Sequence, residues 1–145
     1  LEIDSKINQY SALKSVSEIL YRIQHQLFNI GTTLATLPED LNDEMPCIKE
    51  EDIVQLEKEM DDFNQNLPAL KSFVLPGGSS INIWLHKART ICRKVERRCV
   101  KLSKICDLDP NVIRYLNRLS DALFVWSRWA NHIEGCDENV WDPNY

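Results

Sequence analysis

The chain has 145 residues and a mass of 16.9 kDa, which is the length of one ordinary domain with a sizeable core. Hydrophobic residues make up 43% and charged residues 27%, with only 4 Gly and 6 Pro, so the composition excludes a disordered or collagen-like chain. The apolar runs fall short of the roughly 18 residues that a membrane span needs, and we therefore expect no membrane contact.

The start of the chain bears on its compartment. No charged-then-apolar signal segment opens it, which favours the cytoplasm. A cleaved organellar transit peptide would leave the same trace, so the mitochondrial matrix stays open for a eukaryotic source. The first residue is Leu1 rather than Met, and we expect that a segment precedes it.

The charges are unevenly distributed. The net charge is -5, yet residues 87–104 hold eight Lys or Arg and a single Glu, while residues 39–62 hold 11 of the 22 acidic residues. An acidic chain with one basic stretch favours a local anionic ligand over a broad nucleic-acid surface. A basic helix face that only meets solvent is the alternative.

The cysteines and histidines do not indicate a metal site. None of the five Cys is spaced as C-x-x-C, and Cys92, Cys99 and Cys106 recur at the seven-residue interval of helix packing. We expect reduced core thiols in an intracellular protein. The three His lie on different predicted helices with no acidic partner at ligand spacing, so we assign no metal ligand.

Apolar residues three and four apart predict four helices, spanning residues 13–34, 53–67, 85–102 and 112–133. This spacing is typical of an all-α, up-down helical bundle, in one domain over residues 1–145. Asp109 and Pro110 are an N-cap and a first-turn proline for the last helix, and Pro68 closes the second. Residues 36–49 form a polar connection, and no window predicts a strand.

The connection over residues 73–80 is unusually apolar. Phe73, Val74 and Leu75 precede Pro76-Gly77-Gly78, in which glycine allows positive φ and close backbone approach. Ser79 or Ser80 can cap the next helix. A tucked-in connection between helices and a ligand-binding loop are both compatible with this pattern, and the first is the commoner.

A row of arginines follows one face of the third helix. Arg89, Arg93 and Arg97 are four residues apart, which places them about 6 Å from one another along the helix. Guanidinium groups at this spacing suit the successive phosphates of a polyphosphate. Salt bridges to the acidic segment 39–62, within or between subunits, are an equal alternative. Asn117 and Arg118 on the fourth helix either line the same cleft or are exposed.

Three stretches of the chain resemble the signatures of one enzyme family. Residues 73–98 read FVLPGGSSINIWLHKARTICRKVERR, residues 115–128 read YLNRLSDALFVWSR and residues 23–36 read IQHQLFNIGTTLAT. Their content and order resemble the ATP:cob(I)alamin adenosyltransferases of the trimeric helical-bundle, propanediol-utilisation type. The resemblance spans nearly the whole chain, and the first two stretches are its most specific part.

This resemblance implies a five-helix bundle that forms a homotrimer with active sites between subunits. It implies a transferase that moves the 5′-deoxyadenosyl group of ATP, with Mg²⁺, to cob(I)alamin and releases tripolyphosphate. A reductase or an adenosylcobalamin-dependent enzyme would be a protein partner. Because the cobalt of cobalamin supplies the nucleophile, the family needs no Ser, Cys or His triad.

The resemblance also implies roles for residues at matching positions. The ATP-binding set would be Arg93, Lys94, Glu96, Arg97 and Asn117. Arg89 would orient the site through a carboxylate of a neighbouring subunit. Phe73 would press on the lower face of the corrin and displace its lower ligand, leaving a four-coordinate cobalt(II) that is easier to reduce. The other cobalamin-binding residues would be Phe124, Val140 and Trp141.

Departures from the family pattern favour an alternative, a non-catalytic corrinoid-binding or chaperone homologue that has lost ATP binding. The family's phosphate loop, with Gly, Thr and Asp before the first long helix, has no counterpart in the chain. Ser5-Lys6-Ile7-Asn8 stands where the family has Asp-Glu-Leu-Asn, so Asp4 would have to supply the carboxylate for Arg89. Lys94 replaces the usual arginine.

Overall fold

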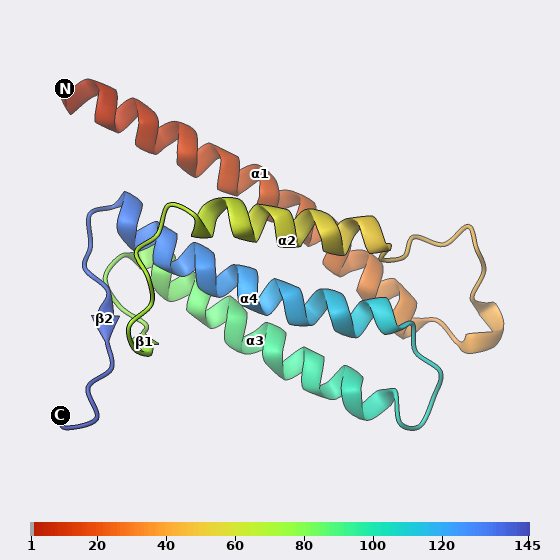
Figure 1. Ribbon diagram of the computed structural model, residues 1–145. Coiled ribbons are helices and arrows are strands. Elements are labelled where there is room, and N and C mark those ends of the chain that lie inside the picture. The colour runs from red at the N-terminus through yellow and green to blue at the C-terminus, as the bar shows by residue number, and fades with distance from the viewer. Residues whose placement is uncertain (1) are drawn as a thin grey trace. The chain divides into compact units, whose positions relative to one another are not determined.

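The computed structural model describes the backbone of residues 2–145 and the side chains from residue 11 onward. These residues form four α-helices: α1 (Glu2–Ala35), α2 (Glu50–Asn64), α3 (Ser80–Leu102) and α4 (Pro110–Ile133) (Figure 1). A short 3-10 helix, η1, covers Pro38–Asp40, and two short strands are β1 (Val74–Leu75) and β2 (Asn139–Val140). The predicted all-α class is confirmed. The side chains of Asp4 and of Ser5-Lys6-Ile7-Asn8 lie outside the described residues.

The internal contacts divide the chain into two units, residues 1–49 and residues 50–145. The first unit consists of α1, η1 and the polar connection that the sequence predicts. In the last turn of α1 and at the residue after it, the hydroxyl groups of Thr32, Thr33 and Thr36 donate to carbonyl oxygens four residues earlier, at 3.1, 3.1 and 2.8 Å. No helix that the structure describes is both long and apolar enough to cross a membrane.

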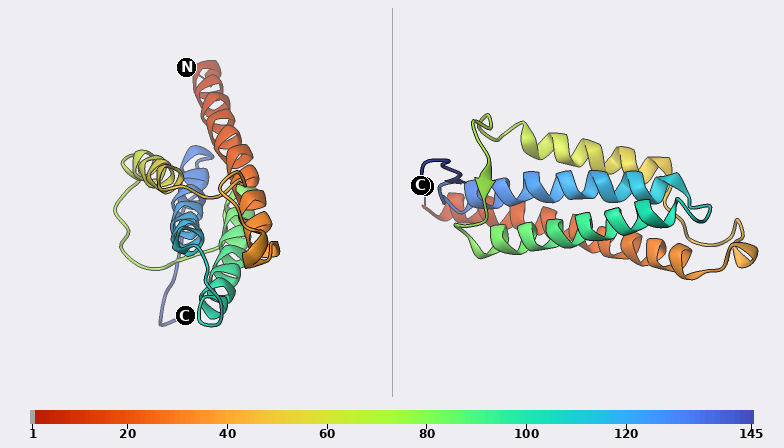
Figure 2. Two further views of the ribbon diagram at one scale, coloured as in Figure 1. Left: turned by 90° about the vertical axis from the view of Figure 1, so that its right-hand side faces the viewer. Right: turned by 90° about the horizontal axis from the view of Figure 1, so that it is seen from below.

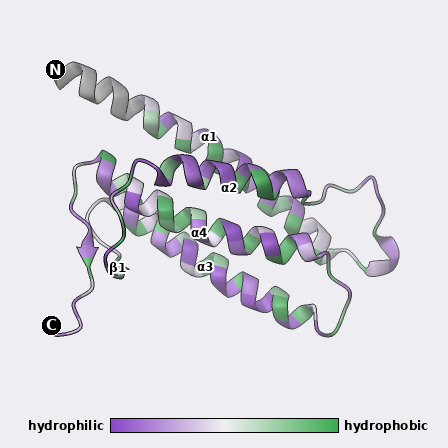
Figure 3. Ribbon diagram, viewed as in Figure 1, coloured by the Kyte–Doolittle hydropathy of each residue, from purple (hydrophilic) through white to green (hydrophobic). Residues whose placement is uncertain are grey.

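The central helix of the second unit is α4, which packs against α2 and against α3 (Figure 2). As a result, 13 of its 24 residues are buried. Val112, Leu116 and Trp126 are almost completely inaccessible, at the three-and-four spacing read from the sequence. The buried apolar residues of the other two helices are Ile53, Leu56, Leu85, Cys92 and Cys99. Figure 3 shows the mixture of polar and apolar positions along all three helices.

The ends of the helices follow from local chemistry. Ser79 caps α3 by accepting a hydrogen bond from the backbone N–H of Asn82. Asp109 caps α4 through the N–H of Asn111, as the sequence predicts. The second helix ends at Asn64, before the predicted Leu67. Beyond it the backbone tightens into turns, in which the N–H of Leu67 donates to the carbonyl of Asn64, and Pro68 disfavours the helical conformation at Leu67.

All five thiols are free. Cys92 and Cys99 are buried in α3, and the thiol of Cys92 donates to the carbonyl of Leu116 at 3.2 Å. Burial, with a smaller contribution from Glu96, raises the pKa of Cys92 to about 12, so this thiol stays protonated. The prediction of core thiols is thus confirmed for Cys92 and Cys99. It is wrong for Cys47, which is exposed.

Two buried asparagines hold the loop between α2 and α3. Asn82 of α3 accepts from the N–H of Gly77 (3.1 Å) and donates to the carbonyl of Ser127 (2.8 Å). Asn131 of α4 accepts from the N–H of Ser79 and donates to the carbonyl of Gly77, both at 3.0 Å. Both side chains are at most 1% exposed. The backbone of this loop is therefore tucked in, yet its Phe73 is 75% exposed.

The short strands join this loop to the end of the chain. Val74 pairs with Val140 and Leu75 with Asn139, in antiparallel register. The N–H of Trp141 donates to the carbonyl of Phe73 at 2.8 Å, which extends the ladder by one residue pair. The sequence predicts no strand here, because two residues are too few for an alternating pattern.

We predict that Gly78→Ala destabilises the protein more than Gly135→Ala. Both glycines have positive φ, at 87° and 66°, which costs other residues roughly 1–2 kcal/mol. A Cβ at Gly78 would also lie 2.7 Å from Oδ1 of Asn131, whereas a Cβ at Gly135 would meet nothing within 4 Å. Chemical denaturation of the two variants measures the difference. Equal losses would contradict the role given to Asn131.

Candidate active site

The basic residues of α3 differ in exposure. Arg93, Lys94 and Arg97 are exposed, and none of them forms an ion pair within the described part of the chain. Arg89 is half-buried. These three exposed cationic groups are therefore available to an anion.

Two acidic residues of α2 pair with α4 instead. Arg114 forms a two-pronged salt bridge to Glu50, with Nη2 to Oε1 at 2.7 Å. Arg118 lies 4.0 Å from the carboxylate of Glu57. The hydrogen bond from Arg114 lowers the pKa of Glu50, and Glu50 in turn raises the pKa of Arg114. Intramolecular pairing between α2 and the arginine row, one of the two expected alternatives, is thus not found among the described residues.

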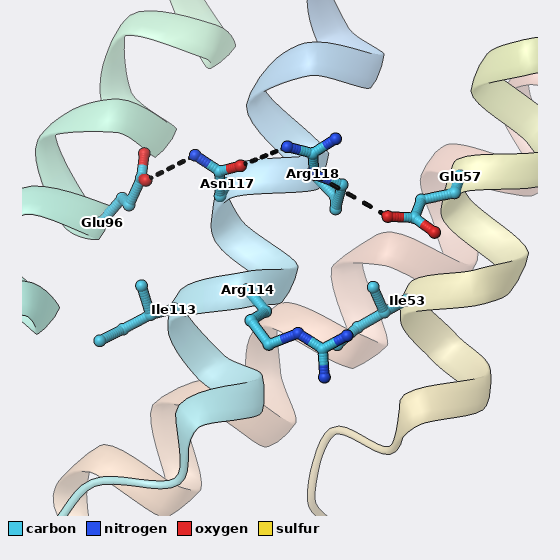
Figure 4. A pocket seen from close by; sticks show the side chains of 7 residues that line it. All are labelled: Ile53, Glu57, Glu96, Ile113, Arg114, Asn117 and Arg118. Carbon is cyan, nitrogen blue, oxygen red and sulfur yellow. Dashed lines mark hydrogen bonds and ion pairs between the residues drawn. The ribbon is translucent and has the colours of Figure 1, made fainter.

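Glu96, Asn117 and Arg118 form a hydrogen-bonded row that joins α3 to α4. The amide nitrogen of Asn117 donates to Glu96 at 2.9 Å, and Nη2 of Arg118 donates to the amide oxygen of Asn117 at 2.8 Å (Figure 4). Because both ends of the amide have a partner, the two bonds fix its orientation. Arg118 is itself held by Asp121 at 3.4 Å. The row therefore brings together two residues of the expected ATP-binding set.

A pocket of about 300 Å³ adjoins this row. Its walls come from α2, α3 and α4, and its lining residues are Ile53, Glu57, Glu96, Ile113, Arg114, Asn117 and Arg118 (Figure 4). Two carboxylates, two guanidinium groups and one amide offer both donors and acceptors to a polar ligand. The volume is at the lower end of the range for small-molecule sites.

Arg89 faces an aromatic ring of α4. Its guanidinium carbon lies 5.0 Å from the ring centre of Phe124, and its Nε is buried with no hydrogen-bond partner in the part of the chain that the structure describes. The same ring makes an edge contact with His86, with centres 6.1 Å apart. A buried guanidinium nitrogen without a partner leaves a donor unsatisfied, so Arg89 retains capacity for an acceptor.

His86 is buried and hydrogen-bonded. The hydroxyl of Ser127 donates to the carbonyl of Phe124 at 2.7 Å, so it accepts from Nε2 of His86 at 3.2 Å. Burial lowers the pKa of His86, and the positive charge of Arg89 lowers it further. The neutral imidazole with its proton on Nε2 is therefore the form that the fold stabilises.

Phe73 and Trp141 form an exposed aromatic pair. Their rings meet edge to face with centres 5.9 Å apart, and the two side chains are 75% and 44% exposed. Val140 beside them is also exposed. The β1–β2 ladder thus brings together three of the four residues expected to bind cobalamin, and the fourth, Phe124, lies with Arg89 instead.

Several residues that shape the site were not singled out from the sequence, namely Asn82, Asn131, Arg114, Arg128 and Glu57. The two asparagines could have been found as amides at positions facing the core in otherwise amphipathic helices. No signal in the sequence indicates which arginine Glu57 meets. Among the described residues, no three His, Cys, Asp or Glu side chains gather in a way that could hold a metal ion.

We predict that His86 makes the protein less stable in mild acid. Its ordinary pKa is 6.5 and its folded-state pKa is lower, so the free energy of unfolding is full above pH 6.5 and falls as the pH drops below it. Thermal denaturation between pH 8 and pH 5 measures this slope, which His86→Gln should flatten. The exposed His132→Gln is the control, and an unchanged slope in the His86 variant would contradict the assignment.

Comparison with known proteins identifies the family. A family model described as cobalamin adenosyltransferase matches residues 2–130. The corrinoid adenosyltransferase of Bacillus subtilis is 43% identical over 116 residues, covering 80% of this chain and 58% of the relative. The corrinoid adenosyltransferase MMAB of Mus musculus is 37% identical over 128 residues, covering 86% of this chain and 54% of the relative. The chain spans about half the length of the curated relatives it matches.

Solved structures agree with these relatives. A variant of the PduO-type ATP:corrinoid adenosyltransferase from Lactobacillus reuteri, complexed with cobalamin and ATP, superposes with a TM-score of 0.82. It is 36% identical, and the match covers 88% of this chain and 70% of that one. A second variant of that enzyme, complexed with ATP, gives a TM-score of 0.83 at 35% identity, over 91% and 74% of the two chains. The chain belongs to the cobalamin adenosyltransferase family.

Proposed function

We propose that this protein transfers the 5′-deoxyadenosyl group of ATP to cob(I)alamin. The proposal rests on two features found together in a member of this family. One is the exposed cations on α3 that have no ion-pair partner in the described chain, and the other is the exposed aromatic pair in the loop before that helix. The first suits a polyphosphate and the second suits the face of a flat macrocycle. The L. reuteri relative is complexed with both ligands.

In the proposed reaction, cobalt(I) attacks the ribose C5′ of ATP with its electron pair. A cobalt–carbon bond forms as the bond from C5′ to the triphosphate oxygen breaks, and tripolyphosphate leaves with the bonding electrons. Arg93, Lys94 and Arg97 stabilise the charge that develops on the leaving group. Magnesium enters with ATP, bound to its phosphates.

Glu96 and Asn117 orient the nucleotide. Their hydrogen bond fixes one donor and one acceptor at the rim of the pocket, where hydroxyl or amino groups of a nucleoside can pair with them. Phe73 presses on the lower face of the corrin and displaces the lower ligand, with Val140 and Trp141 beside it. Phe124 lies apart from these residues, against Arg89, and would contact the corrin from α4.

A homotrimer with sites between subunits is part of the proposal. The buried Nε of Arg89, which has no hydrogen-bond partner among the described side chains (residues 11–145), supports a carboxylate from a neighbouring subunit as its acceptor. A reductase that supplies reduced cobalamin, or an enzyme that receives the product, would be a further partner.

The direct assay mixes the full-length protein with reduced cobalamin, ATP and magnesium. We expect adenosylcobalamin, seen by its absorbance, together with an equal amount of tripolyphosphate. If neither adenosylcobalamin nor tripolyphosphate forms, the proposal is contradicted. Cobalamin binding with neither product would instead identify a non-catalytic corrinoid binder.

We predict that Arg93→Ala lowers kcat/KM roughly 100-fold or more, because one charged donor to the leaving group is lost. The melting temperature should stay unchanged, since Arg93 is exposed and has no ion-pair partner in the described chain. Arg98→Ala, an exposed arginine on the same helix, is the matched control with near-normal activity. A large loss of stability in the Arg93 variant would show that the residue is structural.

A further inference from the structure

Arg128 of α4 is a buried cation that the proposed reaction does not use. Its side chain is 4% exposed. A guanidinium group in such a place is costly unless its donors are satisfied.

Its two bonded donors reach two different segments of the chain. Nε forms a salt bridge to the carboxylate of Glu138, which directly precedes β2. Nη2 donates to the backbone carbonyl of Pro68 at 2.7 Å, in the connection that leads from α2 to β1. One side chain thus ties the segments that lead into the two strands to the central helix.

The ladder needs such an anchor. Each strand has two residues, and an isolated pair of strands is marginal even when it is much longer. The remaining links across it are the Trp141 N–H to Phe73 carbonyl bond and two weaker side-chain bonds of 3.4 Å, from Ser72 and from Asn139. By contrast, α4 is fixed next to Arg128 by fully buried Trp126, Ser127 and Ala130.

We propose that Arg128, with Glu138, is a positioning residue that keeps Phe73 and Trp141 paired for the corrin face. The corrin as ligand rests on the proposed function. The role of Arg128 in holding the two strands does not. Arg128 touches neither substrate in this account. It acts by holding the two strands at the spacing that brings the aromatic rings together.

The primary variant is Arg128→Lys. Lysine keeps the charge, but a single ammonium group cannot reproduce the fork that reaches Glu138 and Pro68 together. Glu138→Gln is the second variant, which keeps Arg128 and its bond to Pro68 and so guards against simple unfolding. Arg98→Lys, the same change at an exposed position, is the matched control.

The first measurement needs no ligand. Amide hydrogen exchange at Trp141 reports the bond to the Phe73 carbonyl, and we expect about tenfold faster exchange in both variants, with core amides of α4 unchanged. The second is the spectrum of cob(II)alamin with ATP. Wild type and Arg98→Lys should give the four-coordinate signature, and both test variants should lose most of it while binding ATP within about twofold of wild type.

The outcomes separate the two proposals. Unchanged Trp141 exchange, or a full four-coordinate signal in both variants, would overturn the role of Arg128. If wild type itself gives no cob(II)alamin response, the proposed function fails, and the exchange result alone decides whether Arg128 holds the ladder. If Arg128→Lys unfolds, the two measurements on Glu138→Gln decide whether the Arg128–Glu138 pair holds the ladder.

Discussion

Asn82 and Asn131 hold the loop before α3 against the two helices that carry the site. Between them they bond two N–H groups and one carbonyl of the loop, and Asn82 also bonds the carbonyl of Ser127 in α4. Leaving any of these buried groups without a partner would cost about 1–3 kcal/mol. The position of Phe73 relative to α3 depends on these hydrogen bonds of Asn82 and Asn131, because the loop contains Gly77 and Gly78 and is flexible by itself.

The central helix α4 links the parts of the site. Asn117 in its first half meets Glu96 of α3, Phe124 contacts Arg89, and Arg128 binds Glu138 next to β2. These residues recur along one helix whose apolar positions are buried against α2 and α3. A polar network attached to such a core can hold its geometry without ligand. This arrangement suits a reaction in which the substrates supply the nucleophile and the leaving group, and the protein supplies orientation and charge.

The helices could be predicted from the sequence because their signals are local. The three-and-four spacing, the Asp109-Pro110 start and the capping serine all act within a few residues. The site residues came from the resemblance, and the structure brings together Glu96 with Asn117, and Phe73 with Trp141.

The rest depends on contacts between distant residues. Salt bridges from α2 could go to α3 or α4, and composition does not distinguish Arg93 from Arg114 as the partner of an acid. The strand pairing joins residues 74 and 140, and each strand is too short for periodicity. The burial of Arg128 was also unpredictable, since arginine is usually exposed and its partners lie 10 and 60 residues away.

The most direct test of this account is a crystal structure of the full-length protein with ATP and cob(II)alamin. The account predicts the triphosphate on Arg93 and Arg97, the corrin against the ring of Phe73, and the ribose C5′ facing the cobalt. A corrin bound away from Phe73, or a triphosphate bound away from the arginine row, would contradict it.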